Sequence, residues 1–485
     1  MTASGVAKSG AIRRQENRGR RRARRLLIAA TLAAATAAGA LVGQAAGDLP
    51  AIDVATASVD GLFTTETGDQ AYSQPIAGLD AAQAALFAKG RDGMHKLWVV
   101  APSMLGLWGR GPTSNAEICT DCHDNNGRGA LPERSDEPLS AMLVRLSVKG
   151  ADEHGAPLPH PAYGGQLQQQ GILGYVPPEG EALVSWKRTV TILDDGTKVE
   201  LRSPEIRFRK LAFGPIGPDT LQSVRLAPAL VGLGLLQAVP EATIASLAGS
   251  AHGDGIRGRV NRVWDIEAQR LIPGRFGLKA NQPSLRQQIA AAFHEDLGVN
   301  SALFPDENCP EVQVACRKFP PGGRPELTPD RLVALTFYMQ ARAVPQRRDR
   351  DDPIARRGEQ LFSSLNCDAC HVPTLLTGDD AMPPQLARQT IHPYTDLLLH
   401  DMGEGLADGR PDFAAGPRDW RTPALWGMGL ARTVNGNAFL LHDGRARNAE
   451  EAVLWHGGEA GPARKRYAAL DAGDRAALLR FLDSL

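Results

Sequence analysis

Two copies of one cysteine pattern constrain this chain of 485 residues more than any other feature. Each copy has two cysteines separated by two residues and followed at once by a histidine, and the residues are Cys119, Cys122, His123, Cys367, Cys370 and His371. The Cys-x-x-Cys-His pattern is the attachment signature of c-type haem. The two thiols form thioethers with the porphyrin, and the histidine is the proximal ligand of the iron. The sequence therefore predicts two covalently bound haem c groups.

Two other uses of paired cysteines fit less well. A structural zinc ribbon places its two cysteine pairs roughly 15–20 residues apart, whereas about half of the chain separates these pairs. A redox-active dithiol does not need a histidine at the next position. The two remaining cysteines, Cys309 and Cys316, close a short loop. In an oxidising compartment such a pair is typical of a structural disulfide, with a catalytic dithiol as the alternative.

The first 47 residues have the pattern of an export signal. Residues 1–25 hold nine basic side chains and one acidic side chain, and an uncharged apolar stretch runs from Leu26 to Val42. We expect residues 1–47 to be a signal peptide that sends the chain to the periplasm. An anchor formed by residues 26–42 is the alternative, because their number is at the short limit for a membrane span.

The rest of the chain carries more acidic than basic residues, because the formal net charge of the whole is zero. This balance argues against nucleic acid as a partner. The membrane is expected as a partner only through the N-terminal segment, since no other uninterrupted run of about twenty apolar residues exists.

Apolar periodicity and turn residues divide the chain further. Helices are expected over 80–98, 283–297, 327–340, 354–365 and the last residues, where Asp471 is the expected N-cap, and a short buried helix over 224–239. An Asp-Asp-Gly turn at 194–196 predicts a hairpin. A charged, proline-bounded segment at 343–353 suggests domains over 48–345 and 346–485. The expected fold is mainly α, with two cytochrome c-like haem domains, loop-rich insertions and a small β-hairpin.

Several longer segments resemble the dihaem oxidoreductase family of peroxidases, which is related to bacterial dihaem cytochrome c peroxidases and MauG-type enzymes. They are Arg275–Pro283, Tyr394–Gly403, Arg421–Trp426, Leu441–Ala446 and Leu454–Ala460. The resemblance implies that the N-terminal haem meets peroxide and that the C-terminal haem receives or stores electrons. It transfers securely only to the six residues of the two motifs.

The resemblance breaks down at one position. In the relatives, a methionine or tyrosine near the His-Asp-Gly segment is the sixth ligand of the C-terminal haem, but here Leu441 precedes His442 and cannot ligate iron. Met428, Met402 and His442 are the candidates that remain, and His400 and His456 are further histidines in this region. After His123 no methionine occurs before Met142, so we expect the N-terminal haem to be the open one.

These observations favour an exported, peroxidase-like oxidoreductase. Electrons would come from a small redox protein or a quinol-derived donor, and peroxide or a partner protein would be the oxidant or substrate. Two alternatives stay open. One is a dihaem electron carrier without enzymatic activity, and the other is a MauG-like oxidase that acts on a partner protein. The acid–base group that peroxide cleavage requires is not identified by any sequence pattern.

Overall fold

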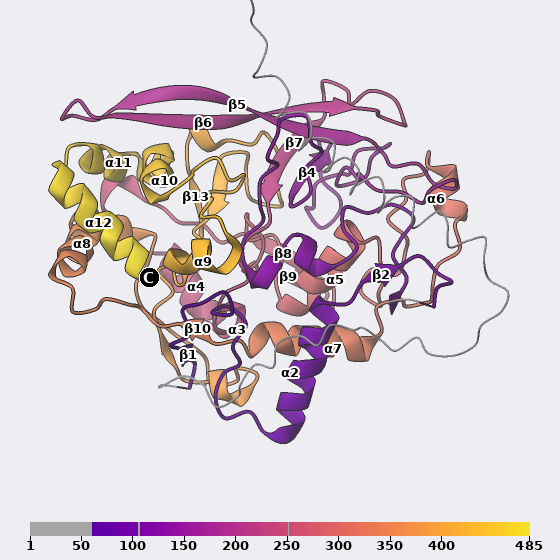
Figure 1. Ribbon diagram of the computed structural model, residues 1–485, viewed down its shortest axis with the longest axis horizontal. Helices are drawn as coiled ribbons and strands as arrows, with labels where there is room; N and C mark the ends of the chain where they lie inside the picture. The colour runs from indigo at the N-terminus through magenta and orange to yellow at the C-terminus, as the bar shows by residue number, and fades with distance from the viewer. Residues whose placement is uncertain (1–60, 105–106, 251) are drawn as a thin grey trace, which may run out of the picture. The chain divides into compact units, whose positions relative to one another are not determined.

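Helices and short strand pairs alternate along the chain (Figure 1). This computed structural model describes residues 61–104, 107–250 and 252–485. The helices are α2 (Ala81–Met94), α3 (Leu233–Gln237), α4 (Glu241–Ala248), α5 (Leu285–Asp296), α6 (Val314–Lys318), α7 (Pro329–Gln340), α8 (Pro353–Ser364), α9 (Ala431–Asn435), α10 (Ala449–Trp455), α11 (Gly461–Ala468) and α12 (Ala472–Ser484).

The strands of the described residues pair two by two. The parallel pairs are β1 (Phe63–Thr64) with β10 (Val344–Pro345) and β2 (Trp98–Val99) with β3 (Leu107–Trp108). The antiparallel pairs are β4 (Met142–Ser147) with β7 (Leu221–Leu226), β5 (Glu181–Ile192) with β6 (Lys198–Arg209), β8 (Arg262–Asp265) with β9 (Arg270–Pro273), β11 (Leu375–Leu376) with β12 (Thr390–Ile391), and β13 (Leu399–Asp401) with β14 (Asp419–Arg421).

The expectation of a mainly α fold is wrong. The structure is 30% helix and 19% strand, because segments that lack helical periodicity pair as short strands instead of forming loops. The 224–239 segment illustrates this, since its first residues complete β7 against β4 and only Leu233–Gln237 is helical. Gly232, with a φ of 64°, separates the strand from the helix.

The predicted hairpin is present and is longer than expected. Strands β5 and β6 run along one edge of the fold in Figure 1, from the β4–β7 pair to the C-terminal helices. At the tip, Leu193 and Leu201 join the apolar cluster of α8 and α12, and Asp195 pairs with Arg475 at 2.6 Å. The hairpin therefore ties the middle of the chain to its C-terminal part.

Helices α8 and α12 cross closely in the C-terminal part. The side chain of Asp352 caps α8, and Asp471 caps α12 as predicted, accepting a hydrogen bond from the Asp474 backbone at 2.8 Å. Gly358 lies at the crossing, where a Cβ atom would overlap the Ala477 carbonyl and Phe481. Helices α2 and α7 repeat this arrangement with Gly90. In each pair, one helix precedes a cysteine motif in the chain: α2 precedes Cys119 and α8 precedes Cys367.

The described residues belong to one compact unit, Asp53–Leu485, and the division into 48–345 and 346–485 stays a prediction. None of the helices within the described ranges has the length and hydrophobicity to span a bilayer. The predicted signal or anchor, residues 1–47, lies outside the described residues.

The α8–α12 crossing generates a stability prediction. Gly358→Ala should lower the free energy of unfolding by about 1–3 kcal/mol, because the new methyl group meets a backbone carbonyl that cannot move aside. Gly461→Ala is the matched control, since a Cβ there meets no atom within 4 Å and alanine favours the helix. Urea denaturation followed by far-ultraviolet circular dichroism measures both. Equal stability of the two variants would contradict this account of the crossing.

Candidate functional site

The C-terminal motif directly follows α8. Asn366, with a φ of 65°, turns the chain into a single 3₁₀ turn, Cys367–Ala369. The backbone N–H of His371 donates to the Cys367 carbonyl at 3.0 Å, so the motif is one closed helical turn. The turn explains why the residue spacing matters, because it brings both sulfur atoms and the imidazole to one side.

The His371 ring is held by a backbone carbonyl. Its Nδ1 atom lies 3.0 Å from the Tyr394 carbonyl oxygen, a contact in which Nδ1–H is the donor. Nε2 is then left with its lone pair, as a metal ligand requires. Burial lowers the pKa of His371 to about 4, and the nearby His456 contributes in the same direction. The ring is therefore neutral at physiological pH.

A largely apolar cavity opens beside this motif. Its wall includes both thiols and His371, and its apolar lining includes Phe362, Leu365, Leu425, Leu440, Val453, Leu478 and Leu482. Arg464 also lines the cavity, and so do two further guanidinium groups, those of Arg128 and Arg421. Both bond only to backbone carbonyls among the described residues, and burial lowers the pKa of each to about 10.

This lining fits a haem group. A porphyrin is planar and apolar over most of its surface but carries two carboxylates. An apolar wall with two half-buried cations that form no ion pair with a carboxylate among the described residues matches both properties. The two thiols and the neutral imidazole are the groups that haem c attachment uses.

Five of the sequence-predicted side chains line the same cavity: His400, His442, His456, Met402 and Met428. His400 is bonded through both ring nitrogens, with Asp396 at 2.8 Å and Glu459 at 2.7 Å. Burial disfavours its charged form, but hydrogen bonds with Asp396, Cys370 and Glu459 outweigh this and raise the pKa of His400 to about 12.

His442 stacks on Trp420, with ring centroids 3.7 Å apart, and its Nε2 atom lies 3.2 Å from Asp443. In His456, Nδ1 lies 2.6 Å from the Ala452 carbonyl oxygen. Met428 begins a 3₁₀ turn, Met428–Leu430, and packs against the α8–α12 cluster. The structure thus gathers the candidates around one cavity, and ligation by Met428 or His442 stays a prediction.

The N-terminal motif has the same local geometry. Residues Cys119–Asp121 form a 3₁₀ turn, and the His123 backbone N–H donates to the Cys119 carbonyl at 3.0 Å. Burial lowers the pKa of His123 to about 4, although polar contacts with the Gly127 and Pro228 backbones oppose this. Its Nδ1 atom is buried without a hydrogen-bond partner of normal geometry in the described part of the chain.

One carboxyl group near this motif, that of Asp296, was not predicted from the sequence. Asp296, at the end of α5, accepts a hydrogen bond from Gln166 at 2.9 Å, and its charge raises the pKa of the Cys119 and Cys122 thiols after the larger effect of burial. Burial raises the pKa of Asp296 itself to about 6, against the nearby Arg145. Only its position against the motif distinguishes it from the many other acidic residues.

The segment after His123 links the two motifs. Asn125 donates to the Val434 carbonyl at 3.0 Å, and the Asn435 amide donates to the Arg128 carbonyl. Arg128 in turn lines the cavity of the C-terminal motif and donates to the Leu441 carbonyl. The loop of one motif therefore forms part of the wall of the other.

Two observations bear on the alternative uses of the motif cysteines, a zinc site and a reactive dithiol. Within the described ranges, no three or more His, Cys, Asp or Glu side chains are grouped as a metal cluster would require. Burial raises the pKa of all four motif thiols, so they lack the thiolate character of a reactive dithiol.

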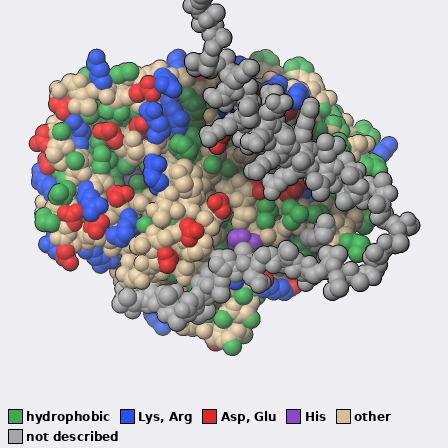
Figure 2. All heavy atoms as spheres, in the orientation of Figure 1, with side chains coloured by type: hydrophobic (Ala, Val, Ile, Leu, Met, Phe, Trp, Pro, Cys, Tyr) green, Lys and Arg blue, Asp and Glu red, His purple; other side chains and the backbone are tan. Residues whose placement is uncertain are grey.

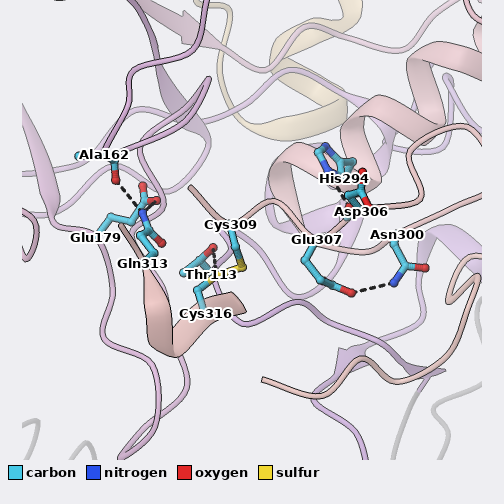
Figure 3. The surroundings of a disulfide bond; sticks show 10 residues. All are labelled: Thr113, Ala162, Glu179, His294, Asn300, Asp306, Glu307, Cys309, Gln313 and Cys316. Carbon is cyan, nitrogen blue, oxygen red and sulfur yellow. Dashed lines mark hydrogen bonds between the residues drawn. A yellow bond between two sulfur atoms is a disulfide. The ribbon is translucent and has the colours of Figure 1, made fainter. Parts of the chain in front are cut away.

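Cys309 and Cys316 lie together, 5.7 Å apart between Cα atoms, and Figure 3 draws them as a bonded pair. Gln313, in the loop between them, donates to the Ala162 carbonyl at 2.8 Å and to the Glu179 carboxylate at 2.5 Å. This pair lies away from both motifs in the chain and fastens the segment that leads into α6.

Comparison with known proteins follows from this geometry. The family model described as "Di-haem oxidoreductase, putative peroxidase" matches residues 53–485. No curated protein matches the chain significantly. Among solved structures, Kuenenia stuttgartiensis hydrazine synthase pressurised with xenon is similar at 16% identity, with a TM-score of 0.24. That match covers 37% of this chain and 63% of the other, less than two thirds of its length. Because the family match includes every described residue, the chain belongs to the di-haem oxidoreductase family.

Proposed function

We propose that this chain is an exported dihaem c-type oxidoreductase with peroxidase-like activity. One haem would be attached to Cys119 and Cys122 with His123 as proximal ligand. The other would be attached to Cys367 and Cys370 with His371. The observation that carries the proposal is the cavity at the C-terminal motif, where two thiols, the His371 imidazole oriented through its Nδ1 and two guanidinium groups without an ion-pair partner in the described part of the chain meet.

The bound groups would supply one-electron redox chemistry and, at an iron with an open position, peroxide cleavage. The chain's own residues orient and enclose them. The Tyr394 carbonyl holds the His371 ring, Arg128 and Arg421 would bind the two carboxylates, and the apolar wall would exclude water. Asp296 is a half-buried carboxyl whose raised pKa would let it hold a proton near the N-terminal motif.

The proposed difference between the two sites rests on the side chains near each motif that can ligate iron. The C-terminal cavity contains several side chains that can ligate iron. Met142, the first methionine after His123, is fully buried in the cluster of β4, β7 and the hairpin, with Leu146 and Tyr163. This packing supports an open N-terminal site that reacts with peroxide and a low-spin C-terminal site that passes electrons to it.

The linking segment supports electron exchange between the sites, because the loop after His123 and the wall of the second cavity share Arg128. We propose a small redox protein or a quinol-derived donor as the source of electrons, and peroxide or a partner protein as the oxidant or substrate. On the face shown in Figure 2, basic and acidic side chains intermingle over the C-terminal helices. This mixed surface supports a protein donor more than nucleic acid.

Export to the periplasm, with residues 26–42 as the only proposed membrane contact, places the chain where haem c is attached and where Cys309 and Cys316 would form a disulfide.

Covalent attachment can be tested by haem stoichiometry. The protein expressed with a c-type maturation system should keep two haems per chain after denaturation, detected by haem staining and by the pyridine haemochrome spectrum. Replacing Cys119 and Cys122 by alanine should leave one haem, and replacing Cys367 and Cys370 should leave the other. Wild-type protein that retains no haem after denaturation would overturn the proposal.

Peroxidase-like function can be tested by stopped-flow absorbance with peroxide, before and after one-electron reduction. We expect one high-spin haem that reacts with peroxide, and turnover when a small electron donor is present. Two low-spin haems insensitive to peroxide would identify an electron carrier. Reaction with peroxide followed by oxidation of a partner protein, without turnover of a small donor, would identify a MauG-like oxidase.

The cysteine pair should matter for stability and not for redox chemistry. Replacing Cys309 and Cys316 by serine should lower the free energy of unfolding by about 2–4 kcal/mol, because a cross-link restricts the unfolded chain. The haem spectra should not change, since the pair belongs to neither motif. Mass spectrometry with and without reductant reports the bond. Lost turnover at unchanged stability would instead point to thiol redox chemistry.

A further inference from the structure

The C-terminal cavity needs a second side chain that can ligate iron if its haem is six-coordinate. Such a side chain must line the cavity and direct an unbonded nitrogen or sulfur atom into it. Five residues line the cavity with suitable atoms: Met402, Met428, His400, His442 and His456. Their hydrogen bonds separate them.

His400 is already satisfied. Its Nε2 atom lies 2.8 Å from Asp396, and its Nδ1 atom lies 2.7 Å from Glu459. If His400 turned to an iron, the buried Asp396 carboxylate would lose its imidazole partner, which is costly, and the half-buried Glu459 would keep only its backbone donors Arg257 and Asp401. His400 is therefore part of the cavity wall and is not the sixth ligand.

His442 is also constrained. Its ring lies flat on Trp420, with 7° between the planes, and Nε2 faces Asp443 at 3.2 Å. Asp443 is held in turn by Arg445 at 2.7 Å. Ligation through Nε2 would break this contact and the stacking together.

His456 has the geometry that His442 and His400 lack. It follows α10 directly, and its Nδ1–H donates to the Ala452 carbonyl at 2.6 Å. Among the described residues its Nε2 atom has no hydrogen-bond partner. The His371 ring is held in the same way, by Nδ1 and the Tyr394 carbonyl at 3.0 Å. The two imidazoles thus share one cavity, each oriented by a backbone carbonyl with Nε2 available.

The methionines show no comparable orientation. Met428 packs against the apolar cluster that contains Phe481 and Leu482. The Met402 carbonyl lies close to Gly457, where an added Cβ would be 2.8 Å from it, so Met402 is a neighbour of His456 along the same wall. A thioether held only by packing is the ordinary state of a buried methionine.

We propose that His456 is the sixth ligand of the haem attached at Cys367 and Cys370, opposite His371. This inference rests on the proposed covalent haem at that motif. Two imidazole ligands make the iron low-spin without a sulfur ligand, and the reduction potential is then lower than with histidine and methionine. The free Nε2 atom of His456 is the observation from which the assignment follows.

Spectroscopy of the full-length holoprotein tests the assignment. The electron paramagnetic resonance and near-infrared magnetic circular dichroism spectra of the ferric wild type should show one low-spin haem with two imidazole ligands. In His456→Ala this signal should be lost and a high-spin signal should replace it, and added imidazole should restore the low-spin form. His456→Met should give the near-infrared band of histidine–methionine ligation and a higher reduction potential.

Matched variants and controls make the outcome decisive. Met428→Leu and Met402→Leu should leave the low-spin signal unchanged, and haem stoichiometry and circular dichroism should match the wild type in every variant. A methionine-type band in the wild type would overturn the assignment even if His456→Ala failed to fold. So would an unchanged low-spin signal in His456→Ala that is lost in His442→Ala. Wild type without covalent haem at Cys367 and Cys370 would overturn the proposed function, and the assignment with it.

Discussion

The close crossing of α8 and α12 is the constraint on which the C-terminal site depends. Because Gly358 lets the two helices approach to backbone contact, the end of α8 delivers Cys367 and His371 to a cavity whose far wall includes Leu478 and Leu482 of α12. A larger residue at the crossing would separate these walls. The same close approach recurs where Gly90 of α2 meets α7, and Cys119 of the N-terminal motif packs against the apolar cluster that includes Phe87 of α2 and Leu335 of α7.

Features set by neighbouring residues could be predicted from the sequence, and features set by distant residues could not. The cysteine motifs, the turn of the hairpin and the Asp471 cap each depend on a few adjacent residues, and the structure has the hairpin and the cap. The mainly α expectation failed in part because pairs such as β4 and β7 join residues 142–147 to 221–226. No local pattern marks one partner of a pair that distant.

The candidate ligands also depend on distant residues, which a sequence pattern does not reveal. His400, His442 and His456 look alike in the sequence, and their different partners decide what each can do. Glu459 and Trp420 come from other segments, so the fold alone reveals that they engage His400 and His442. Ala452 lies four residues before His456, and a histidine that bonds a carbonyl at a helix end is a local signal. That spacing could have favoured His456 before the structure was known.

Positive charge beside the C-terminal cavity would raise the reduction potential of an iron bound there, whereas a second imidazole ligand would lower it. An imidazole in place of a thioether lowers the reduction potential, because it stabilises the ferric state more. Arg128 and Arg421 are half-buried cations that line the cavity, and nearby positive charge would destabilise the more positive ferric iron and raise the potential. Two carboxylates on the porphyrin would cancel part of that effect. Because Arg128 belongs to the loop that follows His123 and its guanidinium reaches the Leu441 carbonyl, its position would influence both the potential of the second site and the anchoring of the first.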